Sequence, residues 1–151
     1  METVSYVAEA GLYYIGDPCY VVRESEWATL LDQVNYFDDD EQFYKGYKIM
    51  CKSTAYGDGM YDAKTDRGEL VGRLPVDSGT IGIMPLECID VTPKEIMDKG
   101  LGVVVAFNNN VWVEVPMGAS RMGRFVFGNI SVDTKETEEE VGWDTEEDET
   151  E

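Results

Sequence analysis

Aspartates at three glycine-containing corners are the residues of this chain whose types and spacing could support chemistry. Asp17 lies in a Gly-Asp-Pro-Cys-Tyr motif, Asp58 in Gly-Asp-Gly and Asp77 in Val-Asp-Ser-Gly. Carboxylates that meet in a cleft can act as a general acid and base or bind a ligand. We therefore take these aspartates, with Tyr20 and Tyr61, as candidate ligand-binding residues. Corner aspartates usually accept hydrogen bonds from turn amides, so the hypothesis requires the three corners to converge.

Histidine is absent from the chain, which excludes several kinds of catalytic and metal site. These are Cys-His and Ser-His-Asp nucleophiles, histidine-zinc sites and facial-triad iron sites. The three cysteines, Cys19, Cys51 and Cys88, lie apart in apolar segments, as buried unreactive thiols do. The carboxylate of Asp17 would raise the thiol pKa of Cys19 rather than lower it. We expect no enzymatic activity, no catalytic residue, no metal and no cofactor.

The segment 56–69 carries four carboxylates, at Asp58, Asp62, Asp66 and Glu69. Calcium prefers several oxygen ligands from a tight loop, but an EF-hand places them at every second residue. The spacing here is close to every fourth residue. We favour a glycine-containing hairpin over a cation site.

The chain is strongly acidic, with 31 acidic and 12 basic residues and a net charge of -19. Ten of the acidic residues and one lysine fall within 135–151, but the rest of the chain is acidic as well. Such a charge repels nucleic acid and anionic membranes and favours a partner with a basic surface. The acidic run Asp38, Asp39 and Asp40, and Trp143 in the C-terminal segment, are candidate partner-binding residues.

Cysteine usage and hydropathy predict the compartment. An odd number of scattered cysteines is typical of a reducing cytoplasm, and no segment has the roughly 20 apolar residues of a membrane span. The N-terminus has no basic region of the kind found in signal peptides. We expect a cytoplasmic protein that binds neither membrane nor nucleic acid directly.

The predicted elements are short strands and two helices. A helix is expected with Ser25 as its N-cap, and a second where Thr92 begins a capping box and Gly100 ends it. Gln42–Ala55 reads as one long strand with a bend at Gly46. The other predicted strands are 4–8, 11–15, 20–22, 70–74, 80–84, 101–107, 111–115 and 124–132. The pattern predicts a mostly antiparallel α+β domain over residues 1–134 and a disordered acidic tail over 135–151.

The corner motifs also carry a resemblance. In their order along the chain they resemble a group of small uncharacterised bacterial and phage proteins with Gly-Asp-Pro-Cys-Tyr, Gly-Asp-Gly-x-Tyr and Val-Asp-Ser-Gly motifs. The segment Gly123–Ile130 is similar to the end of the same group. The resemblance implies a β-rich α+β domain and a phage or mobile-element setting. It implies no activity, so no residue inherits a role from it.

The interpretation we favour is a non-enzymatic, phage-type acidic protein that occupies a site on a host protein, as an inhibitor does. Three alternatives remain open. One is a nucleic-acid mimic whose carboxylates take the place of phosphates in a basic groove. Another is a domain that sequesters a small molecule or nucleotide between the Asp17, Asp58 and Asp77 corners. The last is a metal-dependent hydrolase that uses the same aspartates.

Overall fold

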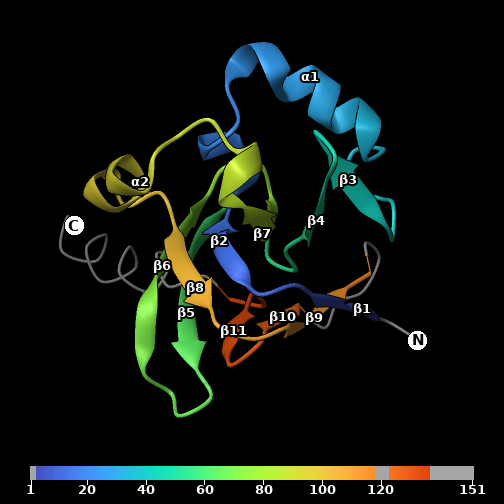
Figure 1. Cartoon of the computed structure of the whole chain (residues 1–151). Helices are drawn as coiled ribbons and strands as arrows, with labels where there is room; N and C mark the ends of the chain where they lie inside the picture. The colour runs from blue at the N-terminus through green and yellow to red at the C-terminus, as the bar shows by residue number, and fades with distance from the viewer. Residues whose placement is uncertain (1–2, 118–122, 137–151) are drawn as a thin grey trace, which may run out of the picture.

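The computed structural model describes residues 3–117 and 123–136, and within them the chain forms two α-helices and eleven strands in two antiparallel sheets (Figure 1). The expected α+β class with mostly antiparallel strands is confirmed. The strands are β1 (Thr3–Ala8), β2 (Gly11–Gly16), β3 (Gln42–Tyr44), β4 (Tyr47–Ser53), β5 (Gly59–Thr65), β6 (Leu70–Val76), β7 (Thr80–Pro85), β8 (Val103–Phe107), β9 (Val111–Pro116), β10 (Arg124–Phe127) and β11 (Ile130–Asp133). The helices are α1 (Glu24–Gln33) and α2 (Pro93–Lys99), with 3-10 turns at Pro18–Tyr20 and Leu86–Cys88.

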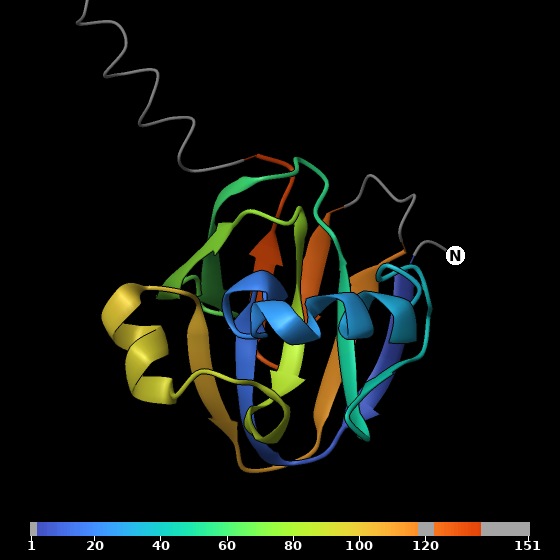
Figure 2. The same ribbon diagram turned by 90° about the horizontal axis from the view of Figure 1, so that it is seen from above.

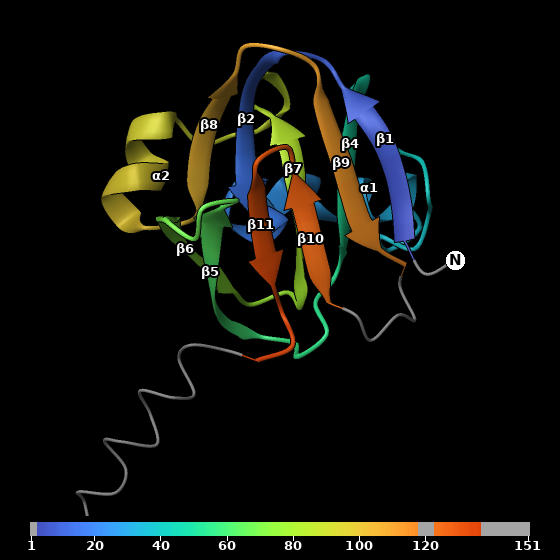
Figure 3. The ribbon, with the colours of Figure 1, turned by 90° about the horizontal axis from the view of Figure 1, so that it is seen from below.

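The molecule has three layers. A six-stranded sheet has the order β1-β9-β10-β11-β5-β6, and a five-stranded sheet has the order β3-β4-β7-β2-β8. The two sheets pack face to face, and α1 and α2 lie on the outer face of the five-stranded sheet (Figure 2). Figure 3 shows the opposite side, where the six-stranded sheet is not covered by either helix.

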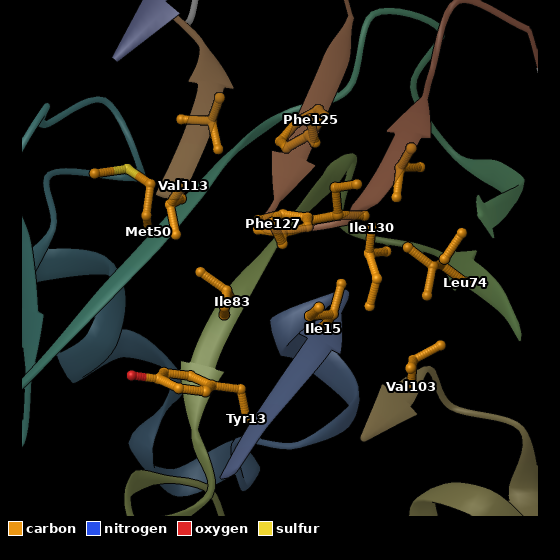
Figure 4. Packing of buried hydrophobic residues seen from close by; sticks show 14 of the residues in the cluster. Tyr13, Ile15, Met50, Leu74, Ile83, Val103, Val113, Phe125, Phe127 and Ile130 are labelled. Carbon is orange, nitrogen blue, oxygen red and sulfur yellow. The ribbon is translucent and has the colours of Figure 1, made fainter. Parts of the chain in front are cut away.

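Alternation along the strands builds two apolar cores. Ile15 of β2, Ile83 of β7 and Phe127 of β10 point into the space between the sheets (Figure 4). Tyr14 points the opposite way from Ile15, because successive side chains of a strand face opposite sides. It packs with Leu30 of α1 in the second core, between the five-stranded sheet and the helices. The central strands of the five-stranded sheet, β4, β7 and β2, are therefore buried on both faces.

The segment expected to be one long strand over 42–55 is instead the hairpin β3–β4. Lys45 and Gly46 both have positive φ, 54° and 84°, and so form a two-residue turn. Phe43 is thereby placed opposite Lys48. The single strand expected over 124–132 is likewise a hairpin, β10–β11, which turns at Gly128 with φ 67°. The prediction failed at 42–55 because lysine rarely adopts positive φ.

Helix boundaries agree with the sequence in one helix and differ in the other. Thr92 accepts a hydrogen bond from Glu95 N at 3.2 Å and Gly100 has φ 65°, so α2 begins and ends as expected. The N-cap of α1 is Arg23 rather than Ser25, and it forms no side-chain capping bond. The strand expected at 20–22 is absent because the chain forms a 3-10 turn at Pro18–Tyr20.

A left-handed turn follows α1. Asn35, Tyr36 and Phe37 have φ values of 53°, 57° and 66°, a conformation that costs about 1–2 kcal/mol per residue. Phe37 is buried and packs against Trp27, with ring centroids 6.0 Å apart. Tyr36 is 73% exposed. Tertiary contacts therefore hold a turn that local preferences oppose.

Candidate functional site

Asp17 is a buried carboxylate whose oxygens are fully occupied. They accept hydrogen bonds from Cys19 N at 2.8 Å, from Asp77 N at 2.7 Å, and from Ser78 N and Ser78 Oγ at 2.8 and 2.7 Å. A carboxylate has about four lone-pair sites, so these four bonds use its capacity. The Tyr14 hydroxyl donates to its main-chain oxygen at 2.9 Å. Asp17 thus joins the end of β2 to the turn between β6 and β7.

The three corners converge, as the ligand-site hypothesis requires. The hydroxyl of Tyr20 donates to the carboxylate of Asp77, which is exposed. Asp58 is also exposed, and its Oδ1 lies beside Gly79, in the turn that Asp17 holds. Convergence does not make Asp17 available, because its lone pairs are taken by the protein's own amides and by a hydroxyl.

Cys19 lies among these carboxylates and is held in its neutral form. Burial, followed by the carboxylates of Asp17, Asp77 and Asp58, raises the pKa of its thiol from 9.0 to about 12. A thiolate is the reactive form of cysteine, so this thiol is a poor nucleophile at neutral pH. In the described part of the chain, no three histidine, cysteine or acidic side chains are grouped so that they could hold a metal ion.

Tyr61 belongs to the core rather than to the corner surface. Its ring is fully buried, and its hydroxyl donates to the Gly57 carbonyl oxygen at 2.6 Å. This hydrogen bond joins Tyr61 to the segment that precedes β5. The contacts observed for Tyr61 therefore stabilise the fold.

The acidic run after α1 is held against the five-stranded sheet by hydrogen bonds. Lys52 is 1% exposed, and its Nζ donates to Asp38 O at 3.0 Å and to Asp40 Oδ1 at 3.1 Å. The buried amide of Gln42 donates to Asp39 O at 3.0 Å. The Asp38 and Asp40 side chains remain exposed. Trp143 and residues 137–151 of the predicted tail lie outside the described residues.

The structure also contains an open pocket of about 420 Å³ that the sequence did not predict. It lies between the edge strand β1 and the tip of the β3–β4 hairpin, which occupy the same side of the molecule (Figures 1 and 3). We call it the aromatic groove, and its lining residues include Tyr6, Tyr13, Phe43, Tyr47, Lys48, Glu9 and Glu87.

A cation already lies among the rings of the aromatic groove. Lys48 Nζ is 4.5 Å from the ring centroid of Tyr6 and 5.7 Å from that of Phe43, within the range of a cation–π contact. Its other neighbour is Glu41, with Oε2 at 3.8 Å. The groove therefore offers aromatic faces and carboxylates, which together suit positively charged guests.

Burial raises the pKa of two tyrosine hydroxyl groups that line the groove, and carboxylates add to this effect at Tyr13. Burial, followed by the charges of Glu9 and Glu87, raises the pKa of Tyr13. Burial raises the pKa of Tyr6 well above its ordinary value of 10.0. Both phenols are neutral at physiological pH, and the anionic charge of the groove comes from its glutamates.

Sequence reasoning missed this groove because its lining comes from three segments. Phe43 and Tyr47 are 48% and 40% exposed, although both are large and apolar. Aromatic residues on both sides of the two-residue turn could have indicated the groove, but the sequence predicts a bend within one strand at this position.

The helices of the described residues are all too short or too polar to cross a membrane. Comparisons of the chain with protein-family models, with curated proteins and with solved structures find no match.

Proposed function

We propose that this chain is a non-enzymatic acidic binding protein that takes a basic, extended segment of a partner protein into the aromatic groove. The observation that carries the proposal is a groove with four aromatic side chains and two glutamates at the edge of β1. Binding there would cover the partner's basic surface, as an inhibitor does. The resemblance of the corner motifs to those of bacterial and phage proteins is our reason to propose a host protein as that partner.

Charge complementarity supports a basic occupant. The chain has a net charge of -19, and Glu9 and Glu87 are exposed within the groove lining. Arginine and lysine bind over aromatic rings with about 0.5–2 kcal/mol per contact. A long-range acidic field also increases the association rate of a basic partner.

The position of the groove supports an extended occupant. β1 pairs with β9 on one side only, so its other edge has unpaired main-chain groups within the described residues. An extended peptide can bind such an edge through main-chain hydrogen bonds while neighbouring pockets take alternate side chains.

The occupied corner argues against the alternatives that use Asp17. A hydrolase or a nucleotide site at the corners would need a carboxylate that is free to accept a proton, a metal or a ligand donor. Asp17 instead accepts four internal hydrogen bonds, which leaves Asp58 and Asp77 as the exposed corner carboxylates.

A peptide titration followed by NMR tests the proposal. The probe is Ac-(Arg-Val)4-NH2, and Ac-(Glu-Val)4-NH2 is the control of opposite charge. We expect the arginine peptide alone to shift the amide signals of Tyr6, Phe43 and Tyr47, with binding that weakens as salt increases. Shifts confined to other surfaces, or equal shifts with both peptides, would contradict the proposal.

A pair of matched variants then locates the contact. Tyr47→Ser removes an exposed tyrosine that lines the groove, and Tyr36→Ser removes one that is exposed elsewhere. We expect Tyr47→Ser to weaken peptide binding about 3- to 30-fold, the range of one aromatic contact, and Tyr36→Ser to change it by less than 2-fold.

A further inference from the structure

We infer that Lys48 is a built-in occupant of the aromatic groove, and that a basic side chain of a partner must displace its ammonium group to bind. The inference rests on the proposed function, since it specifies how that same groove is regulated. The first observation is the pairing of residues within the β3–β4 hairpin. Phe43 and Lys48 are cross-strand partners of β3 and β4, so the lysine side chain lies beside the phenylalanine ring.

Lys48 connects the two walls of the groove. Its stem starts on β4, and its Nζ lies 4.5 Å from the ring centroid of Tyr6, which belongs to β1 of the other sheet. Its ion pair with Glu41 is loose, at 3.8 Å, and the Glu41 side chain is 73% exposed. Solvent screens such a pair, so the aromatic rings are the principal contact of this ammonium group.

A guest cation needs the same position. The Tyr6 and Phe43 rings are the faces of the groove that a lysine or arginine would use, and a second positive charge beside Lys48 would be repelled. Lys48 therefore competes with basic guests. On binding, the cation–π contact of Lys48 is replaced by that of the guest. The affinity for the guest is therefore lower than it would be in a groove without Lys48.

The alternative is that Lys48 only ties the two sheets together. In that case its removal would loosen the groove and weaken binding, whereas competition predicts tighter binding. The two accounts therefore differ in sign.

Lys48→Ala tests the inference, with Lys45→Ala as its matched control. Lys45 lies in the turn of the same hairpin and carries the same charge, but it pairs with Asp90 and is not part of the groove lining. With Ac-(Arg-Val)4-NH2 as the probe, we expect Lys48→Ala to lower the Kd about 3- to 10-fold relative to wild type, as loss of one competing contact predicts. Lys45→Ala should change the Kd by less than 2-fold, because its ammonium group pairs with Asp90 outside the groove lining and its charge is screened.

The wild-type chain gives a second measurement that does not depend on a variant folding. The ring of Tyr6 should shift the Hε signals of Lys48 upfield in the free protein, and peptide binding should return them toward free-lysine values. An unchanged or weaker affinity of Lys48→Ala, or Hε signals that stay upfield at saturation, overturns the inference while the proposed function stands. Absence of binding by wild type and by Lys48→Ala overturns both.

Discussion

Replacing Asp17 by asparagine should strongly destabilise the fold, although the two side chains have nearly the same shape. The substitution turns one carboxylate oxygen into an NH2 group, which donates instead of accepting. Oδ2 faces two main-chain N–H groups, those of Asp77 and Ser78. Oδ1 faces one, that of Cys19, and the hydroxyl of Ser78, which can rotate to accept. The amide nitrogen should therefore take the place of Oδ1.

The cost follows from this arrangement. One buried N–H loses its acceptor, and the remaining bonds lose the strength that a charged acceptor gives. An unsatisfied buried group costs about 1–3 kcal/mol, and a bond to a charged group exceeds a neutral one by about 1 kcal/mol. Together these give about 2–4 kcal/mol of lost unfolding free energy for Asp17→Asn, and more for Asp17→Ala.

Urea unfolding at pH 7, followed by tryptophan fluorescence, measures this loss. Asp66→Asn is the matched control, because Asp66 is exposed in the β5–β6 turn and should change stability by less than about 0.5 kcal/mol. Ser78→Ala should cost an intermediate amount, about 1 kcal/mol, for the loss of one of the four bonds. A loss below 1 kcal/mol for Asp17→Asn would refute the claim that this carboxylate holds the corner together.

Three further predictions concern the strand packing and the thiols. Gly82→Ala should cost more than about 3 kcal/mol, because its Cβ would lie 2.2 Å from the Met50 carbonyl oxygen; a melting temperature within 2 °C of wild type would contradict this. Alkylation of Cys19 by iodoacetamide at pH 8 should be roughly a thousand times slower in the folded chain than in urea, since its pKa is about 12 instead of 9.0; equal rates would contradict the raised pKa. The free energy of unfolding should fall as pH rises above about 9. Burial raises the pKa of Cys19, Cys51 and Cys88, so above this pH the unfolded chain binds fewer protons than the folded chain. A urea midpoint that is the same at pH 8 and pH 10 would count against this.

The aspartate corners show which features of the candidate site could be predicted from the sequence. The glycine and proline pattern placed turns at Asp17, Asp58 and Asp77, and the corners do come together. Their roles could not be predicted, because the donors that occupy Asp17 include the amides of Asp77 and Ser78, sixty residues away along the chain. A turn aspartate and a ligand-binding aspartate have the same local sequence and differ in which distant groups reach them.

The aromatic groove shows where prediction from the sequence failed. Periodicity predicted most strands, including β2, β8 and β9, but not their pairing: β8 pairs with β2 in the five-stranded sheet, and β9 pairs with β1 and β10 in the six-stranded sheet. It missed the turn at Lys45, because a lysine with positive φ is set by tertiary contacts and not by propensity. With that turn missed, Phe43 and Lys48 could not be placed as cross-strand neighbours, nor could either be placed next to Tyr6.

The two edges of the sandwich have different consequences for motion. At one edge β6 and β8 are so close that a Cβ on Gly72 would lie 2.8 Å from Val103 Cγ2, and at the other edge the groove separates β1 from the β3–β4 hairpin. A small rotation of one sheet about the tight edge would therefore change chiefly the width of the groove. Under the proposed function, core residues such as Phe127, which lie between the sheets, would influence the size of the guest that the groove admits. Repacking the interior would then change the specificity of the proposed binding without changing any residue of the groove surface.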